Sequence, residues 1–146
     1  MPIKSFRGLL ADGVIDTVSL HTNTGSMGYR IVKFQLLAHK PGNEHNESVV
    51  KIYSVPQTAS DAFIDFSDQT LLAAGYYRDD ASRVYSQSET VIFDNKKFNQ
   101  DIYITHVDVE AGQGINYYIE LEQVKLDLTE NTVATLKDIR NIESQS

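Results

Sequence analysis

The sequence predicts an all-β fold, a single antiparallel β-sandwich of jelly-roll type with about eight or nine strands. Three observations support this fold class. Val, Ile and Thr, which favour strands, make up 34 of the 146 residues, and aromatic residues make up a further 10%. Short apolar–polar alternating runs recur along the chain, with turn residues between them. No long helical pattern separates these runs, which argues against a parallel crossover fold.

In the first part of the chain, alternation and turn signals define the expected strands. We expect them over Ile3–Leu10, Val14–Leu20, Tyr29–Ala38 and Ser48–Val55, with a short one over Ala62–Phe66. Asp12-Gly13 separates the first two runs and is typical of a tight hairpin turn, because glycine readily takes a positive φ. Pro56 ends the fourth run, since proline donates no ladder hydrogen bond.

The second part contains the least regular and the most regular segments. Thr70–Tyr77 fits either a strand or a helical turn, and the polar stretch Arg78–Glu89 predicts a long loop. Further strands are expected over Thr90–Phe93, Asp101–Val109 and Ile115–Leu126. Thr132–Ile139 fits a short helix as well, but its Thr and Val content favours a closing strand. The chain then forms one domain over residues 1–146, in which the polar tail at residues 141–146 frays.

The apolar side of each expected strand predicts the core. A chain of 146 residues buries enough surface to fold without a metal or a disulfide. The expected core residues are Val18, Val32, Phe34, Val50, Ile52, Phe93, Ile104, Ile119 and Leu121.

Composition argues against several functions. The chain has no cysteine, which excludes a disulfide scaffold, a cysteine-based zinc site and a thiol nucleophile. Its net charge of −7 argues against nucleic-acid binding, which needs a basic surface. Neither a signal peptide nor an apolar run long enough to cross a membrane is recognisable, so we expect synthesis in a cytoplasm and no membrane partner.

Side chains that could carry chemistry match no known pattern. His39 and His45 flank an acidic loop, and Asp61, Asp65 and Asp68 lie close together, yet neither group has the spacing of a metal site. We expect solvated polar turns in the first case and turn capping in the second. His106 lies among apolar residues and predicts a hydrogen-bonded packing residue rather than a base.

No nucleophile elbow, phosphate-binding loop or marked pair of carboxylates is recognisable either. We therefore expect no cofactor and no catalytic residue, and hence a protein that is not an enzyme.

The irregular middle segment predicts an interaction surface. Tyrosine and arginine dominate the energetics of many protein interfaces, and a long loop needs contacts to offset the entropy of ordering it. Ordinary packing of the tyrosines against their own sheet is the equal alternative. The expected interface residues are Tyr76, Tyr77, Arg78, Arg83 and Tyr85.

Several longer segments carry a resemblance to a known group of proteins. They are residues 65–74 (DFSDQTLLAA), 92–95 (IFDN), 98–106 (FNQDIYITH), 115–122 (INYYIELE) and 131–141 (NTVATLKDIRN), with KSFRG at 4–8 and GYRIVKF at 28–34. Together they resemble small virion structural proteins of marine tailed bacteriophages. The resemblance implies a capsid decoration (cement) protein, made in the host bacterial cytoplasm and located in the virion. It also implies that the partners are the major capsid protein or other virion proteins and further copies of the chain.

Other non-enzymatic functions remain open at this point. A tail, neck or receptor-binding component and a carbohydrate-binding β-sandwich module fit the same composition. The absence of tryptophan weakens the carbohydrate alternative, although tyrosine also provides an aromatic platform.

Overall fold

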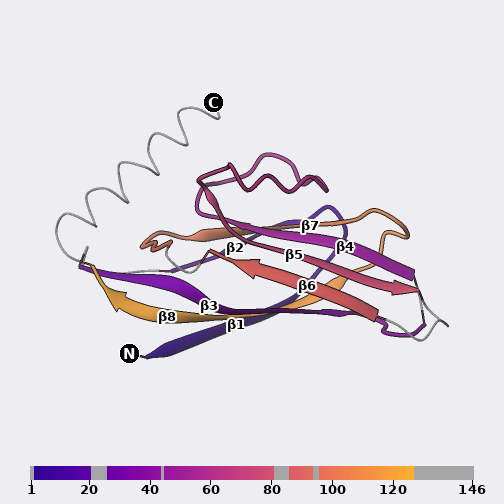
Figure 1. Ribbon diagram of the computed structural model, residues 1–146, viewed down its shortest axis with the longest axis horizontal. Helices are drawn as coiled ribbons and strands as arrows, with labels where there is room; N and C mark the ends of the chain where they lie inside the picture. Colours follow the sequence, from indigo (N-terminus) through magenta and orange to yellow (C-terminus); the bar gives the residue numbers. More distant parts are fainter. Residues whose placement is uncertain (1, 21–25, 44, 81–85, 94–95, 127–146) are drawn as a thin grey trace.

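The computed structural model describes residues 2–20, 26–43, 45–80, 86–93 and 96–126. Eight antiparallel strands form two packed sheets, which confirms the predicted all-β sandwich (Figure 1). The strands are β1 (Ile3–Leu10), β2 (Ile15–Val18), β3 (Met27–Ala38), β4 (His45–Tyr53), β5 (Leu71–Asp80), β6 (Ser86–Ile92), β7 (Ile102–Asp108) and β8 (Ile115–Lys125). No helix among the described residues has the length and apolar character needed to span a membrane.

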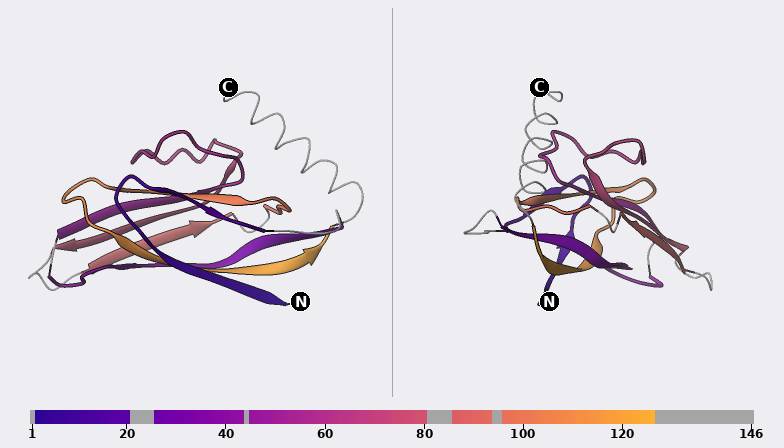
Figure 2. Two further views of the ribbon diagram at one scale, coloured as in Figure 1. Left: turned by 180° about the vertical axis from the view of Figure 1, so that it is seen from behind. Right: turned by 60° about the vertical axis from the view of Figure 1, so that its left-hand side comes forward.

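The strand order is that of a jelly roll except for the position of β6. One sheet has the order β1-β8-β3 and the other β2-β7-β4-β5-β6, and the two layers are seen from the side in Figure 2. Pairing of β1 with β8, β2 with β7 and β4 with β5 is the nested pattern of a rolled antiparallel ribbon. In this chain β6 extends the larger sheet beside β5 and packs against β3 without a ladder between them.

The turn at Asp12-Gly13 was correctly predicted, but the prediction that it closes a hairpin was wrong. Gly13 has a φ of 79°, and Val14 N–H donates to the Ala11 carbonyl across the turn at 3.2 Å. The two strands on either side nevertheless belong to different sheets, because each pairs with a strand from the second half of the chain. The turn therefore carries the chain across the sandwich instead of closing a hairpin.

The core lies between the two sheets and contains most of the predicted residues. The residues that the sequence predicted and the structure buries are Val18, Phe34, Val50, Ile52, Ile104, Ile119 and Leu121. Gly75 lets the sheets approach closely, because a Cβ atom there would lie 2.8 Å from Leu36 Cδ1 and 3.1 Å from Phe34 Cε2. Phe93 is half-buried and packs at the margin against the small cluster of Tyr53, Leu71 and Ala74.

Val32 was wrongly assigned to the core. The pairing of β3 with β8 shifts between Ile31 and Lys33, so Val32 is the extra residue of a β-bulge. The bulge reverses the alternation along β3: Ile31 and Phe34 both face the core, whereas Val32 is 36% exposed. Strict alternation from Phe34 backwards assigned the wrong face to every residue before the bulge.

The middle of the chain also differs from the prediction. Residues 62–66 form no strand and belong to the β4–β5 connection, residues 54–70. The predicted loop over Arg78–Glu89 is wrong at both ends, because β5 continues to Asp80 and β6 begins at Ser86. The predicted strand over Thr132–Ile139 and the tail at residues 141–146 lie outside the described residues.

Candidate interaction surface on the five-stranded sheet

The β4–β5 connection lies on the outer face of the five-stranded sheet, at the top of Figure 1. Several residues that point outward from β4 and β5 are buried, among them Val49, Tyr53 and Ala74. The two ends of the connection are joined by a hydrogen bond from Ser54 N–H to the Thr70 carbonyl at 2.9 Å. The core thus covers one face of the five-stranded sheet, and its own connection covers part of the other face around Lys51 on β4.

A buried lysine attaches this connection to the sheet. Lys51 points outward from β4 and is only 3% exposed. Its Nζ donates to Asp61 Oδ1 at 2.7 Å and to the Phe63 carbonyl at 2.6 Å. The hydrogen bond from Lys51 holds the pKa of Asp61 below its usual value. An ammonium group so far from water is stable only with such partners, so Lys51 fixes the position of the segment around Phe63.

Three aspartates order the connection internally. Each carboxylate accepts a hydrogen bond from the backbone N–H two residues further on, at 2.8 to 2.9 Å: Asp61 from Phe63, Asp65 from Ser67 and Asp68 from Thr70. The predicted turn capping is therefore present at all three positions. Among the described residues, no group of three or more acidic, histidine or cysteine side chains is arranged to hold a metal ion.

The ordered connection presents apolar side chains to solvent. Phe63 is 81% exposed and Phe66 is 55% exposed, while Ile64 and Val91 are exposed to a smaller extent. Ile64, Phe66 and Val91 line a hollow of about 260 Å³ above β5 and β6. Phe66 contacts the Phe93 ring edge-on, with the centroids 5.2 Å apart. We call Phe63, Ile64, Phe66 and Val91 the apolar patch.

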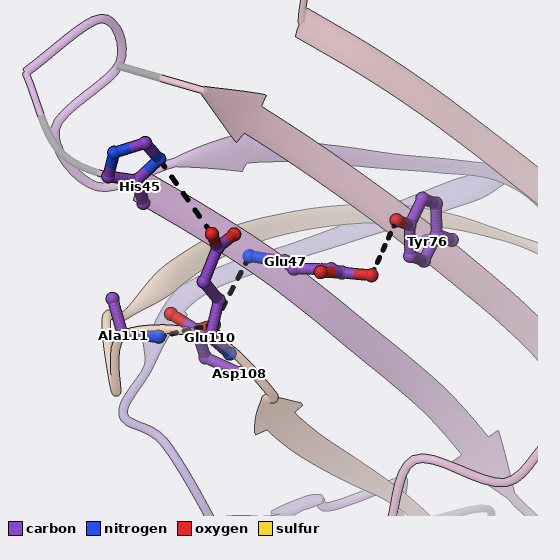
Figure 3. A network of polar contacts seen from close by, with 6 residues as sticks. All are labelled: His45, Glu47, Tyr76, Asp108, Glu110 and Ala111. Atoms are coloured by element: carbon purple, nitrogen blue, oxygen red, sulfur yellow. Dashed lines mark hydrogen bonds and ion pairs between the residues drawn. The ribbon is translucent and has the colours of Figure 1, made fainter.

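The predicted interface residues separate into three groups. Tyr76 faces outward and lines the same hollow as the apolar patch, and its hydroxyl donates to Glu47 Oε1 at 2.9 Å (Figure 3). Arg78 is exposed on the same face, opposite Glu47 in the strand register. Tyr77 faces the core and is 3% exposed, so in this sandwich it follows the packing alternative. Arg83 and Tyr85 lie outside the described residues.

Acidic residues near this end of the sandwich have structural partners. Asp79 is buried, and its Oδ2 accepts a hydrogen bond from Gly42 N–H at 2.8 Å. Burial raises the pKa of the Asp108 carboxyl group, but hydrogen bonds from four backbone N–H groups outweigh this effect and hold the pKa below its usual value. The donors to Asp108, partly visible in Figure 3, are Glu110, Gln113, Glu47 and Ala111.

His106 is a packing residue, as predicted. It is fully buried, with Nδ1 3.0 Å from the Ala11 carbonyl and Nε2 2.9 Å from Ser48 Oγ, which also contacts Asn46 Oδ1. Because Ala11 offers only an acceptor, Nδ1 carries a proton. Burial lowers the pKa of His106 and outweighs the opposite effects of the Ala11 carbonyl and the nearby carboxylates. His45 lies at the surface, with Nδ1 3.9 Å from Glu110 Oε1.

The apolar patch was not predicted from the sequence. Its segment was assigned to a short strand, where alternate apolar residues would be buried. The signal that identifies a loop was nevertheless present, because Asp65-Phe66-Ser67 and Asp68-Gln69-Thr70 have the spacing of aspartate turns. Apolar residues inside such a loop are candidates for exposure.

Comparison of the chain with protein-family models gives no match, and no curated protein compared with it is significantly similar.

Proposed function

We propose that this chain is a non-enzymatic structural protein of a tailed-phage virion, a capsid decoration protein that docks on the shell through the apolar patch. The single observation that carries the proposal is the exposure of Phe63 and Phe66 on a connection that is fixed to the sheet. Contiguous exposed apolar side chains mark interaction surfaces in soluble proteins. A surface that is ordered before binding loses less conformational entropy on association.

Two sets of polar groups among the described residues support a structural function. Ser48 and His106 are in contact, as in a nucleophile–base pair, but both are sealed from solvent and no substrate reaches them. The aspartates of the β4–β5 connection are occupied by backbone N–H groups. A docking function needs none of these groups to react, and it requires no cofactor.

Two weaker arguments agree with this proposal. The resemblance to virion structural proteins includes residues 65–74, which contain Phe66 of the apolar patch and the start of β5. Jelly rolls occur in many viral capsid and lectin domains, although a fold alone assigns no function. Location in the virion, binding to the major capsid protein and self-association are parts of the same proposal.

Electron microscopy of virions that carry or lack this protein tests the proposal. We expect additional density on the outside of the shell in the particles that carry it, with the five-stranded sheet turned towards the shell. Particles with the protein should also withstand a higher temperature, because a ligand that binds only the intact shell stabilises it by mass action. Absence of the protein from purified virions would refute the proposal.

A further inference from the structure

The opposite face of the sandwich contains a second hollow with a different chemistry. It is a groove of about 730 Å³ on the outside of the three-stranded sheet. This volume is within the range of small-molecule binding sites. Five of the groove residues are Arg7, Leu9, Gln35, Asn116 and Tyr118. We refer to this hollow as the sheet groove.

The strand register places these side chains in two rows across the sheet. Tyr118 on the central strand β8 lies between Arg7 on β1 and Gln35 on β3. In the neighbouring row, Asn116 lies between Leu9 and Leu37, which are 51% and 57% exposed. An aromatic ring, two amides and a guanidinium therefore lie together, with an exposed leucine on either side of Asn116.

The central strand of the groove has no free backbone hydrogen-bonding groups. Because β8 pairs with β1 on one side and with β3 on the other, its backbone N–H and C=O groups are used within the sheet. An extended peptide that binds by strand addition can pair only at β1 or β3, the strands at the two ends of this sheet, and not over β8. A ligand that lies over β8 is recognised by side chains. The amides of Gln35 and Asn116 suit hydroxyl groups, since both partners donate and accept hydrogen bonds.

The charges in and beside the groove favour an acidic ligand. Among the described residues, Arg7 and Lys33 have no carboxylate within ion-pairing distance; Arg7 lies opposite Tyr118, and Lys33 lies opposite Glu120 in the next row of the sheet. Lys33 Nζ is 6.0 Å from the centre of the Tyr118 ring. Glu120, one row away, is held by the Tyr118 hydroxyl, which donates to its Oε2 at 2.6 Å. A guanidinium without a partner is suited to bind a carboxylate through two parallel hydrogen bonds.

We infer that the sheet groove binds an oligosaccharide that carries carboxylate groups, such as a uronic-acid glycan. Arg7 binds the carboxylate, Gln35 and Asn116 bind hydroxyls, and the sugar ring packs beside Tyr118 and the flanking leucines. This site is separate from the apolar patch, so a decoration protein docked by that patch presents the groove away from the shell. The inference does not depend on docking, because the isolated protein contains the whole groove.

Nuclear magnetic resonance titration of the ¹⁵N-labelled protein with trigalacturonate tests this site. We expect saturable shifts of the Gln35 and Asn116 side-chain amides and of β8 at concentrations up to about 10 mM. Arg7→Gln should weaken binding by about tenfold or more, since it removes a charge-assisted contact. Arg78→Gln is the matched control, because it removes an exposed arginine from the other sheet, and it should leave binding within about twofold of the native value.

Two further probes separate the components of the ligand. Maltotriose has the hydroxyls without the carboxylates, and the blocked peptide Glu-Gly-Glu has carboxylates without the hydroxyls. Both should bind at least about tenfold more weakly than trigalacturonate. The inference is overturned by equal binding of either probe, by the absence of shifts in the groove, or by an Arg7→Gln variant that binds like the native protein.

Discussion

The two outer faces of this sandwich are built in opposite ways. The five-stranded sheet is partly covered by a connection that Lys51 fixes from beneath, and it presents apolar side chains. Among the residues that the structure describes, none is seen to cover the outer face of the three-stranded sheet, which we call the bare face, and one pair of its charges, Arg30 and Glu122, is in contact at 3.3 Å. A jelly roll needs only its inner faces to fold, so the outer faces are free to differ in chemistry.

The difference shows how buried polar groups contribute to a surface. On the covered face, one buried ammonium binds two oxygens of the connection and thereby positions Phe63. On the bare face, Arg30 and Glu122 remain partly exposed and are screened by water. The pair of Lys51 and Asp61 therefore orders the β4–β5 connection, whereas the pair of Arg30 and Glu122 only lies on the surface of the three-stranded sheet. Four experiments test this difference between the two faces.

The largest effect on stability is expected at the inner face of the three-stranded sheet, which packs in the core. Ile119 lies on the inner face of β8 and is fully buried, so Ile119→Ala should lower the free energy of unfolding by about 2–5 kcal/mol. Val32→Ala on the same sheet should change it by less than about 0.5 kcal/mol, because the bulge directs Val32 outward. Urea unfolding of both variants measures the two values. Equal effects would contradict the assignment of inner and outer faces.

The second largest effect is expected when the β4–β5 connection loses its attachment to the five-stranded sheet. Lys51→Met removes the hydrogen bonds to Asp61 and the Phe63 carbonyl and should cost about 1–2 kcal/mol. Hydrogen exchange should accelerate in residues 61–67 and remain unchanged in the sheets. Arg30→Met is the control from the bare face, with an expected cost below about 0.5 kcal/mol. Unaltered exchange around Phe63 in Lys51→Met would show that other contacts order the connection.

The third effect is a loss of stability in acid. The pKa of His106 is lowered in the folded protein, so the unfolded chain takes up this proton first. Stability is then fully present above about pH 6.5 and falls as the pH decreases, by at most about 1.4 kcal/mol per pH unit for one proton. Asp61 and Asp108, whose pKa values are also lowered, add a further loss below about pH 4.

Urea midpoints measured between pH 8 and pH 5 check the histidine effect. In His106→Gln the decrease between pH 6.5 and pH 5 should be smaller than in the native protein, even if the variant is less stable overall. An unchanged slope would mean that another group takes up the proton.

The smallest effect is expected from chelation. The three aspartates of the connection bind backbone N–H groups, so EDTA should change the melting temperature by less than about 1 °C. A decrease that calcium reverses would contradict this expectation and would point to Asp61, Asp65 and Asp68 as ligands.

The sequence predicted the strands well where apolar and polar residues alternate clearly, because alternation is a local signal, and poorly in the middle of the chain. Ile3–Leu10 was predicted with its observed bounds, and the strand ending at Ala38 was predicted to within two residues. Pairing is not local: nothing between Asp12 and Val14 reveals that the strands on either side pair with β8 and β7. The bulge at Val32 is equally hidden, because an apolar residue in an apolar run gives no sign that the register shifts.

The positions of the residues expected at an interface were predicted only in part. Tyr76 and Arg78 face outward as an interface requires, but the adjacent Tyr77 faces the core because successive strand residues point to opposite sides. Treating residues 78–89 as a loop concealed this alternation. The exposure of Phe63 and Phe66 depends on Lys51 and on the aspartate turns, and only the folded structure brings these groups together.

The most direct test of the central claim is sedimentation of the purified protein with virion shells that lack it. The double variant Phe63→Ser/Phe66→Ser should bind the shells at least about tenfold more weakly than the native protein, with little change in its melting temperature. The matched variant Leu9→Ser/Leu37→Ser removes two exposed apolar side chains from the bare face and should bind like the native protein. Native binding by the first variant, or loss of binding by the second, would contradict docking through the apolar patch.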